Sequence, residues 1–472
     1  MGIVISALGA FVNIKNLLIT SCLWLLIRGR YSKVTMQMPV NVIVGLQRGD
    51  EGKGRFVDML AEEHDIVARF NGGNNAGHTV VLPDGRDLAL HQVPSGIAHT
   101  HTVNVIGNGA LVNPEKLAEE IESIESQDIE VGEHNLKLSS AAHLILPHHI
   151  YEDRIREAGK NRQGSTCSGI APVASYKAMR SGARLEMVNN DPNGLFEMIY
   201  HGLKAQRYER KVLGLEEVNE LETAKEYVDT AQKLGAYITD TVFYINKQLT
   251  KDRPARVLAE GAQAFLLDID QGMYPFTTSS NTTSGGVTTG LGVAPHHIEY
   301  VTGVAKAVQS HVGGGPFVTE IHDSDILSAL HGDMNTIDAE KGTTTGRTRR
   351  LGYLDIPQIR RAQMVNGDRQ HQTMAISKLD WVNRFGPLVK VCVEYERKGN
   401  TYDIAPDSAY KLEQCKPIYE ELPTWEEDIQ DVRHFEDLPK NAQKYIHFLE
   451  EETGIFIEMI GVGPKRDQVI ER

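Results

Sequence analysis

Short apolar runs alternate with longer amphipathic stretches along most of the chain. Val40–Gly45 (VNVIVG) is β-branched and stops at a glycine, as a buried strand does. After the glycine-rich residues 49–54, Phe56, Val57 and Leu60 recur at helical spacing, so this region predicts a strand, a glycine loop and a helix. Further strands are predicted at 66–70, 103–106, 256–259, 388–393 and 455–460, and long helices at about 196–210 and 223–249. This alternation predicts an α/β fold with a largely parallel central sheet, flanking helices and long loops.

The segment at 1–38 does not fit this pattern. Residues 3–27 are strongly apolar, but Lys15 falls near their middle, where a lysine costs about 2.5–3.5 kcal/mol on insertion into a bilayer. Positive charges follow the apolar run, whereas in a secretory signal they precede it. Three interpretations stay open: a leader or upstream read-through ahead of a start at Met36 or Met38, a weak anchor or targeting segment, and a packed helix. Residues 39–472 are expected to form one domain, because no linker or repeat divides them.

Charge and cysteine content argue against two classes of protein. The 472 residues include 49 Lys and Arg against 63 Asp and Glu, and the net charge of −14 argues against a protein that coats nucleic acid. The four cysteines (Cys22, Cys167, Cys392 and Cys415) lie far apart, so neither a disulfide framework nor a zinc site is expected. A reducing, cytoplasmic location is therefore predicted, with no nucleic-acid partner and no membrane association.

Four stretches are dense in Gly, Ser, Thr and Asn: residues 71–79, 164–182, 272–292 and 341–352. Hydroxyls, amides and bare backbone N–H groups can all bind a polar ligand. Ligands of open α/β sheets bind beyond the carboxyl ends of the strands. These stretches therefore predict a composite polar site at the edge of the sheet, although solvated connections remain the plain alternative.

The sequence Gly49-Asp-Glu-Gly-Lys-Gly54 has the parts of a phosphate loop. Its glycines let backbone N–H groups face an anion, a helix N-terminus follows, and Lys53 can reach phosphate oxygens. It is not a Walker A motif, because Gln47 and Gly54 occupy positions that need glycine and Ser or Thr. An acidic Asp50 suits such a loop if it ligates Mg²⁺ or removes a proton. A tight turn with a surface lysine is the structural alternative.

Five motifs in order carry a resemblance to a known family. They are GLQRGDEGKGRFVD (45–58), NGGNNAGHT (71–79), EGAQAFLLDIDQGMYPFTTSSNTTSGG (260–286), GTTTGRTRRLGYLD (342–355) and SKLD (377–380). Together they resemble adenylosuccinate synthetase, a P-loop-like GTP-binding ligase that joins L-aspartate to IMP through a 6-phosphoryl-IMP intermediate. The resemblance runs from about Val42 to Pro464. It implies IMP, GTP and L-aspartate as substrates, Mg²⁺ as cofactor, and a homodimer.

The resemblance assigns roles residue by residue. Asp50 matches the catalytic base, His78 the general acid, and Gln263 the glutamine beside the purine. Asp50 and the carbonyl of Gly77 match the protein ligands of Mg²⁺. The GTP contacts match Gly49, Asp50, Glu51, Gly52, Lys53, Gly54, Arg55, Gly77, His78, Thr79, Arg349, Lys378, Leu379, Asp380, Gly461, Val462 and Gly463. The IMP contacts match Asp50, Lys53, Asn75, His78, Thr166, Arg180, Gln263, Thr278 and Arg347, with Arg180 reaching the neighbouring subunit's IMP. The aspartate contacts match Thr343, Thr344, Thr345, Arg347 and Arg349.

The chemistry explains these residue types. Phosphorylation of the purine O6 needs a base, and it needs positive charge around the transferring phosphoryl group. A carboxylate at Asp380 can accept hydrogen bonds from guanine N1 and N2, which favours GTP over ATP. Arg347 and Arg349 suit carboxylates and phosphate oxygens through bidentate bonds.

Two positions depart from the family pattern. Arg48 stands where the family usually has Trp, and Ser168 stands where an arginine is expected near the aspartate carboxylates. Arg48 is a candidate to replace that lost charge, on charge counting alone. Two other functions remain as alternatives: a phage-type enzyme that joins aspartate to a guanine nucleotide, and a GTP-binding regulatory module without ligase activity.

Overall fold

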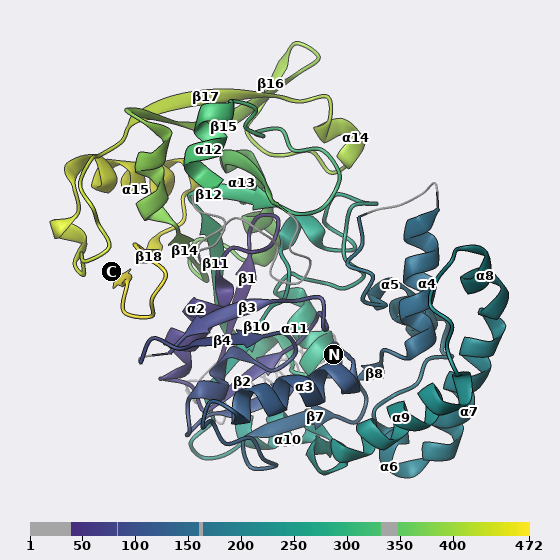
Figure 1. Cartoon of the computed structure of the whole chain (residues 1–472). Helices are drawn as coiled ribbons and strands as arrows, with labels where there is room; N and C mark the ends of the chain where they lie inside the picture. The colour runs from purple at the N-terminus through teal and green to yellow at the C-terminus, as the bar shows by residue number, and fades with distance from the viewer. Residues whose placement is uncertain (1–38, 83, 160–163, 332–347) are drawn as a thin grey trace, which may run out of the picture. The chain divides into compact units, whose positions relative to one another are not determined.

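A ten-stranded sheet forms the centre of the computed structural model, which describes residues 39–82, 84–159, 164–331 and 348–472 (Figure 1). In sheet order its strands are β19 (Val469–Glu471), β18 (Ile457–Gly461), β14 (Gln372–Ser377), β11 (Ile298–Lys306), β1 (Val40–Gly45), β10 (Val257–Glu260), β2 (Ile66–Arg69), β5 (Val103–Ile106), β7 (Leu136–Ser139) and β9 (Ile238–Thr239). Every neighbouring pair is parallel except β18 and β19.

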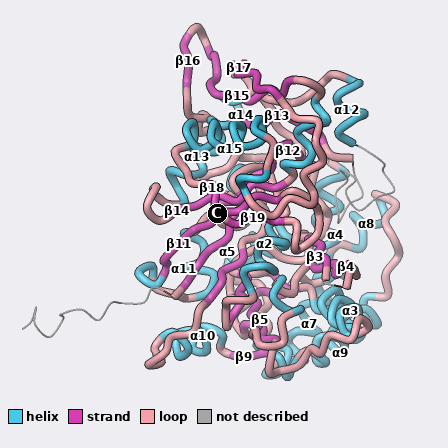
Figure 2. Tube along the Cα trace, turned by 90° about the vertical axis from the view of Figure 1, so that its left-hand side faces the viewer, coloured by secondary structure: helices cyan, strands magenta, loops and turns pink. Residues whose placement is uncertain are grey.

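Strand β1 lies inside the sheet, between β10 and β11, and its Val42 pairs with Ala259 on one side and Val301 on the other. Its apolar run is continuous because helices cover both faces of the sheet. On one face Ile43 packs against Phe56 of α2 (Lys53–Ala61). The opposite face packs against α10 (Thr241–Leu249) and α11 (Gly285–Leu291). Figure 2 shows the strands side by side with helices around them.

A second, five-stranded sheet is formed by strands from the C-terminal half of the chain, which alternate in sequence with strands of the central sheet. It contains β12 (Val308–His311), β13 (Arg350–Asp355), β15 (Leu388–Arg397), β16 (Asn400–Tyr402) and β17 (Lys416–Pro423). Two further ladders pair β3 (His78–Val81) with β4 (Asp87–Leu90), and β6 (Leu111–Val112) with β8 (His143–Leu144). Helices α12 (Ser324–His331), α13 (Ile356–Asn366), α14 (Ala409–Leu412) and α15 (Lys440–Thr453) belong to this half of the chain.

The middle of the chain forms a helical group, at the lower right of Figure 1. It consists of α4 (Pro147–Ala158), α5 (Ile170–Met179), α6 (Glu186–Asn190), α7 (Pro192–Ala205), α8 (Arg207–Val212) and α9 (Glu220–Lys233), while α3 (Pro114–Glu125) lies against α9. Leu195, Ile199 and Leu203 recur every four residues on α7, so one face of that helix is buried. That face shares a core with Tyr227 of α9.

The structure confirms the predicted α/β class and the predicted strands, with shifts of one to a few residues at their ends. The long helix predicted at 223–249 is wrong: α9 ends at Lys233, β9 follows, and α10 begins at Thr241. Asp240 caps that new helix, accepting a hydrogen bond from the Phe243 N–H at 2.9 Å. The helix predicted at 196–210 is likewise two, α7 and α8. The run at 388–393 belongs to the second sheet.

Residues Pro39–Arg472 form one compact unit. The three interpretations of the segment at 1–38 lie outside the described part of the chain. Among the helices that the structure describes, none combines the length and the apolar character needed to cross a bilayer.

Candidate active site

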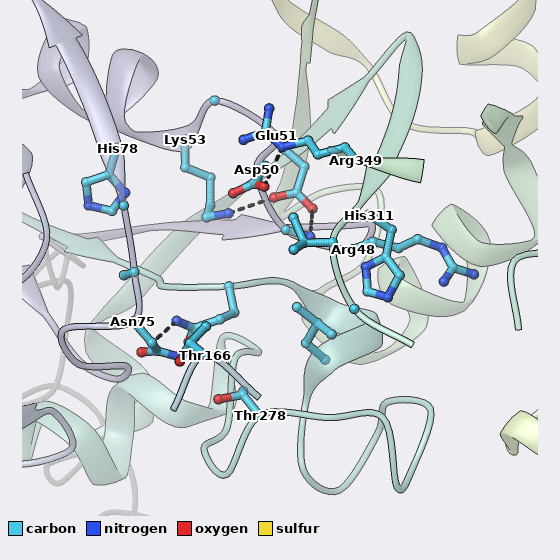
Figure 3. Close-up of a pocket in the computed structure, with 18 of the residues that line it drawn as sticks. Arg48, Asp50, Glu51, Lys53, Asn75, His78, Thr166, Thr278, His311 and Arg349 are labelled. Carbon is cyan, nitrogen blue, oxygen red and sulfur yellow. Dashed lines mark hydrogen bonds and ion pairs between the residues drawn. The ribbon is translucent and has the colours of Figure 1, made fainter. Parts of the chain in front are cut away.

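One pocket, with a volume of about 440 Å³, gathers the polar stretches predicted from the sequence. It lies beyond the carboxyl ends of β1, β10, β11 and β14. Figure 3 shows residues that line it. Stretches 71–79, 164–182 and 272–292 all contribute to its lining, and so does Arg349 from the fourth. Since β1 lies where the strand order reverses, this is the position that ligands occupy in open α/β sheets. The stretch at 164–182 also contains helix α5, and 272–292 contains α11.

The phosphate loop joins β1 to α2, and its conformation requires glycine at position 45, where β1 ends, and at position 52, before α2 begins. Gly52 has φ 82° and directly precedes the first helical residue, Lys53. The Glu51 carboxylate turns inward and is fully buried, where it accepts hydrogen bonds from Gly49 N at 2.9 Å and Lys53 Nζ at 2.6 Å. A Cβ at Gly45 would lie 2.5 Å from this carboxylate, so the position requires glycine. Lys53 is therefore a buried cation held by a neighbouring acid at the edge of the pocket.

Asp50 projects from the same loop into the pocket. Its φ of 59° is unusual for a residue with a side chain. Arg349 Nε lies 2.9 Å from Asp50 Oδ2, and the Asp50 side chain is 31% exposed to solvent. Asp50 and the backbone of Gly77 line the same pocket. Two oxygen ligands of this kind, completed by ligand phosphates and water, suit Mg²⁺.

His78 begins β3 and faces the pocket. A Cβ on Gly54 would lie 2.7 Å from the His78 Cβ, so glycine in α2 lets the two elements meet. His78 Nε2 lies 3.1 Å from Glu260 Oε1 and also contacts Arg69. Burial, with the cations Arg69 and Lys53, lowers the pKa of His78 well below its ordinary value. The imidazole is therefore neutral at pH 7, ready to donate an N–H hydrogen bond.

The candidate nucleotide contacts lie opposite the phosphate loop. Gln263, with φ 58°, donates from Nε2 to Asn75 Oδ1 at 3.4 Å. Its Oε1 is buried and has no hydrogen-bond donor among the described residues, so it has capacity for a ligand. Thr166 and Thr278 also line the pocket. Arg180 caps α5 and is exposed, outside the lining of this pocket.

The expected guanine end of the pocket contains Lys378 and Asp380. Lys378 Nζ lies 3.4 Å from the centre of the Trp381 ring. The Leu379 side chain is buried in the hydrophobic core, and contact of this residue with GTP stays a prediction. Of the candidates at 461–463, only Gly463 lines the pocket, and its carbonyl accepts a hydrogen bond from Arg55.

Four further candidates, all assigned to aspartate binding, lie outside the described residues: Thr343, Thr344, Thr345 and Arg347. Ser168 carries no charge, unlike the arginine expected there, and its Oγ accepts a hydrogen bond from Thr166 Oγ1 at 2.9 Å. It is not among the lining residues.

Sequence reasoning missed several residues of this site. The buried Glu260 accepts from Ser95 N at 2.8 Å and lies beside His78, although it stands in a quoted motif. An acid at the end of a buried strand is the signal that could have found it. Glu260 lies behind the lining residues, whereas Trp381 and Lys306, which donates to Ser310 Oγ at 2.6 Å, line the pocket itself. A lone lysine or tryptophan in a sequence carries no comparable signal.

Comparison with known proteins covers nearly the same residues as the sequence resemblance. The family model described as adenylosuccinate synthetase matches residues 42–470. The adenylosuccinate synthetase of Clostridium perfringens is 42% identical over 437 residues, which are 92% of this chain and 99% of that protein. The enzyme of the same name from Bacillus cereus is 42% identical over 430 residues, 90% of this chain and 97% of the relative.

Solved structures agree with the fold. The fully ligated adenylosuccinate synthetase of Plasmodium falciparum superposes with a TM-score of 0.81 at 35% identity, covering 92% of this chain and all of the other. The succinoaminodeoxyadenylate synthetase of cyanophage S-2L, solved with dGMP and with dATP as energy donor, gives a TM-score of 0.55 at 17% identity, covering 92% and 95%. At that identity the phage protein supports the fold alone.

Proposed function

The chain belongs to the adenylosuccinate synthetase family, and from this premise we propose how its pocket carries out the GTP-dependent ligation of L-aspartate to IMP. The enzyme makes adenylosuccinate, GDP and phosphate. The observation that carries the proposal is the meeting of Asp50, Lys53, His78 and Gln263 in one pocket, from segments that lie far apart in the sequence. A module that only binds GTP would not need an acid in its phosphate loop together with His78 and Gln263. The phage-type alternative is not favoured.

Asp50 acts as the base in the first step. It takes the proton from N1 of IMP, so that charge develops at O6 and O6 attacks the γ-phosphorus of GTP. Lys53 neutralises the phosphoryl group as it moves. Its ammonium group is held in the pocket lining by the buried Glu51 carboxylate, which supports this role because the cation is in place before the phosphates bind. His78 donates an N–H hydrogen bond to the transferring phosphoryl oxygens.

The fit of Mg²⁺ rests on the donor set. Asp50 offers a partly exposed carboxylate and Gly77 a backbone carbonyl, which are hard oxygen ligands. When bound there, Mg²⁺ supplies positive charge to the phosphate oxygens. The ion pair between Arg349 and Asp50 holds the carboxylate in the pocket until the substrates arrive.

In the second step the neutral amine of L-aspartate attacks C6, the bond between C6 and O6 breaks, and phosphate leaves with the proton that the amine gives up. Arg349, together with the stretch at 343–347, would bind the aspartate carboxylates through paired N–H groups. Asp380 would accept hydrogen bonds from N1 and N2 of guanine, with Lys378 and Trp381 beside it. These contacts support GTP as the phosphoryl donor.

The exposed Arg180 supports a homodimer in which this residue reaches the IMP of the neighbouring subunit, because it lies outside the pocket of its own chain. The scattered cysteines support a reducing, cytoplasmic location.

Phosphate release and the ultraviolet difference spectrum of the product test the proposal. We expect adenylosuccinate from GTP, Mg²⁺, aspartate and IMP, and none when GMP replaces IMP. Asp50→Asn should lower kcat by about 10²–10⁴, the usual worth of a positioned base. The control, Asp252→Asn, changes an exposed acid outside the pocket and should leave the rate unchanged. Full activity in Asp50→Asn, or a product with GMP alone, would overturn the proposal.

A further inference from the structure

Arg48 is the residue that departs from the family's tryptophan, and the structure gives it a definite environment. Its side chain is buried, with 2% exposure. The guanidinium carbon lies 4.3 Å from the centre of the Phe317 ring, and Nη2 donates to the Pro316 carbonyl at 2.9 Å. In Figure 3 the side chain extends from the phosphate-loop segment toward His311. None of the ion pairs formed by the described residues includes Arg48.

The partner of this guanidinium is a glycine-rich loop that lines the pocket. Three successive carbonyls of residues 314–316 each contact a basic side chain: His311 Nε2 at 3.1 Å, Arg350 Nη1 at 3.0 Å and Arg48 Nη2 at 2.9 Å, in that order. The Phe317 ring that follows has the Arg48 and Arg350 guanidiniums 4.3 and 5.4 Å from its centre. A loop of three glycines and a proline has little order of its own, so these contacts fix its position.

This loop also lies against two of the segments that carry candidate IMP contacts. A Cβ at Gly315 would lie 2.8 Å from the Phe276 ring, two residues before Thr278. On the other side, a Cβ at Gly164, two residues before Thr166, would lie 3.6 Å from Gly314 N. The position of the loop therefore sets the spacing between the segments of Thr166 and Thr278.

We propose that Arg48 is a positioning residue for the IMP end of the pocket, which it serves by stacking on Phe317 and holding the loop at 313–316. The inference rests on the proposed function. It is an alternative to the idea that Arg48 substitutes for the charge lost at Ser168, because the guanidinium stacks on an aromatic ring and its Nη2 donates to a carbonyl, while Nε and Nη1 have no hydrogen-bond partner among the described residues. For this role the planar shape of the Arg48 guanidinium matters more than its charge. Burial lowers the pKa of Arg48 only to about 10, which leaves it protonated at neutral pH.

Arg48→Lys tests this, because lysine keeps the charge but loses the planar stack and the fixed geometry of Nη2. We expect KM for IMP to rise by about three- to tenfold, which corresponds to the net contribution of one ordinary hydrogen bond. KM for GTP, KM for aspartate and kcat should each stay within about twofold. Phe317→Leu should give the same pattern, and the double variant should be no worse than the poorer single variant, since both remove one interaction.

Arg397→Lys is the matched control. Its guanidinium carbon lies 5.1 Å from the Tyr402 ring, on a hairpin outside the pocket, so its kinetics should match those of the wild-type enzyme. An unchanged KM for IMP in Arg48→Lys would overturn the inference, as would a parallel change in all constants or a rise confined to KM for aspartate. If Arg48→Lys does not fold, Phe317→Leu carries the same test. A wild-type enzyme inactive with IMP would instead overturn the proposed function.

Discussion

The buried pair of Glu51 and Lys53 allows a sharp test of the phosphate loop. Glu51→Gln removes the negative charge that holds Lys53 but keeps an oxygen that can accept from Gly49 N. Breaking a buried ion pair costs about 3–5 kcal/mol. The retained acceptor and the slight exposure of Lys53, 6%, bring the expected loss to about 2–4 kcal/mol. For a chain of this length, an unfolding entropy of about 2 cal/mol/K per residue converts this into a fall of about 2–4 °C in Tm.

GTP provides the decisive comparison. In the wild-type protein the phosphates must compete with Glu51 for Lys53, whereas in the variant Lys53 has no anionic partner in the loop. Saturating GTP with Mg²⁺ should therefore raise Tm more in Glu51→Gln than in the wild type. Calorimetry of both proteins with and without GTP measures the two increments. Glu119→Gln, which breaks the exposed pair with Lys116 on α3, is the control and should shift Tm by less than about 1 °C. Equal GTP increments in wild type and Glu51→Gln would refute contact between Lys53 and the phosphates.

Three further predictions follow from single contacts. Burial raises the pKa of Asp355 to about 7. The folded chain therefore keeps a proton that the unfolded chain loses near pH 4. The free energy of unfolding should fall by up to about 4 kcal/mol as pH rises from 4 through 7. Chemical unfolding at pH 5 and pH 8 should find this fall smaller in Asp355→Asn, and an identical fall would contradict it. Gly54→Ala places a Cβ 2.7 Å from the His78 Cβ and should lower kcat by about tenfold or more. The control, Gly285→Ala, would place a Cβ 3.9 Å from its nearest neighbour and should leave kcat unchanged. Asp380→Asn should raise KM for GTP about 10²-fold and let XTP serve as donor, because an amide matches the xanthine edge; steady-state kinetics with both nucleotides decides this.

Local sequence predicts the parts of this site that are continuous in the chain. The order of strand, glycine loop and helix around Lys53 follows from neighbouring residues, and the structure confirms it. The prediction of one long helix at 223–249 is wrong because its amphipathic pattern continues through a break. Asp240 and the turn at Gly235 mark that break, and capping signals within a pattern are easily read as part of its polar face.

Contacts between distant residues cannot be predicted in this way. Glu260 lies beside His78, from a distant part of the sequence, only because β10 and β3 both reach the same pocket. Charge counting predicts that Arg48 acts through its charge, but Phe317 offers it an aromatic face that no local pattern indicates. Leu379 stands in a motif of polar contacts, and the 3₁₀ turn at Leu379–Phe385 directs it into the core.

Helix α2 forms hydrogen bonds with a segment near the C-terminus, which is synthesised much later than the helix itself. Its Arg55 donates to the carbonyl of Gly463, and Arg466 Nη2 donates to its Asp58 at 2.6 Å, in each case across 408 residues. At about 5–20 residues per second, a ribosome needs on the order of 20–80 s to reach those partners. Throughout that interval the phosphate loop exists without these two hydrogen bonds. A growing chain therefore lacks part of the support for its nucleotide site, and β1 and α2 must wait for partners from the far end of the chain while the rest is synthesised.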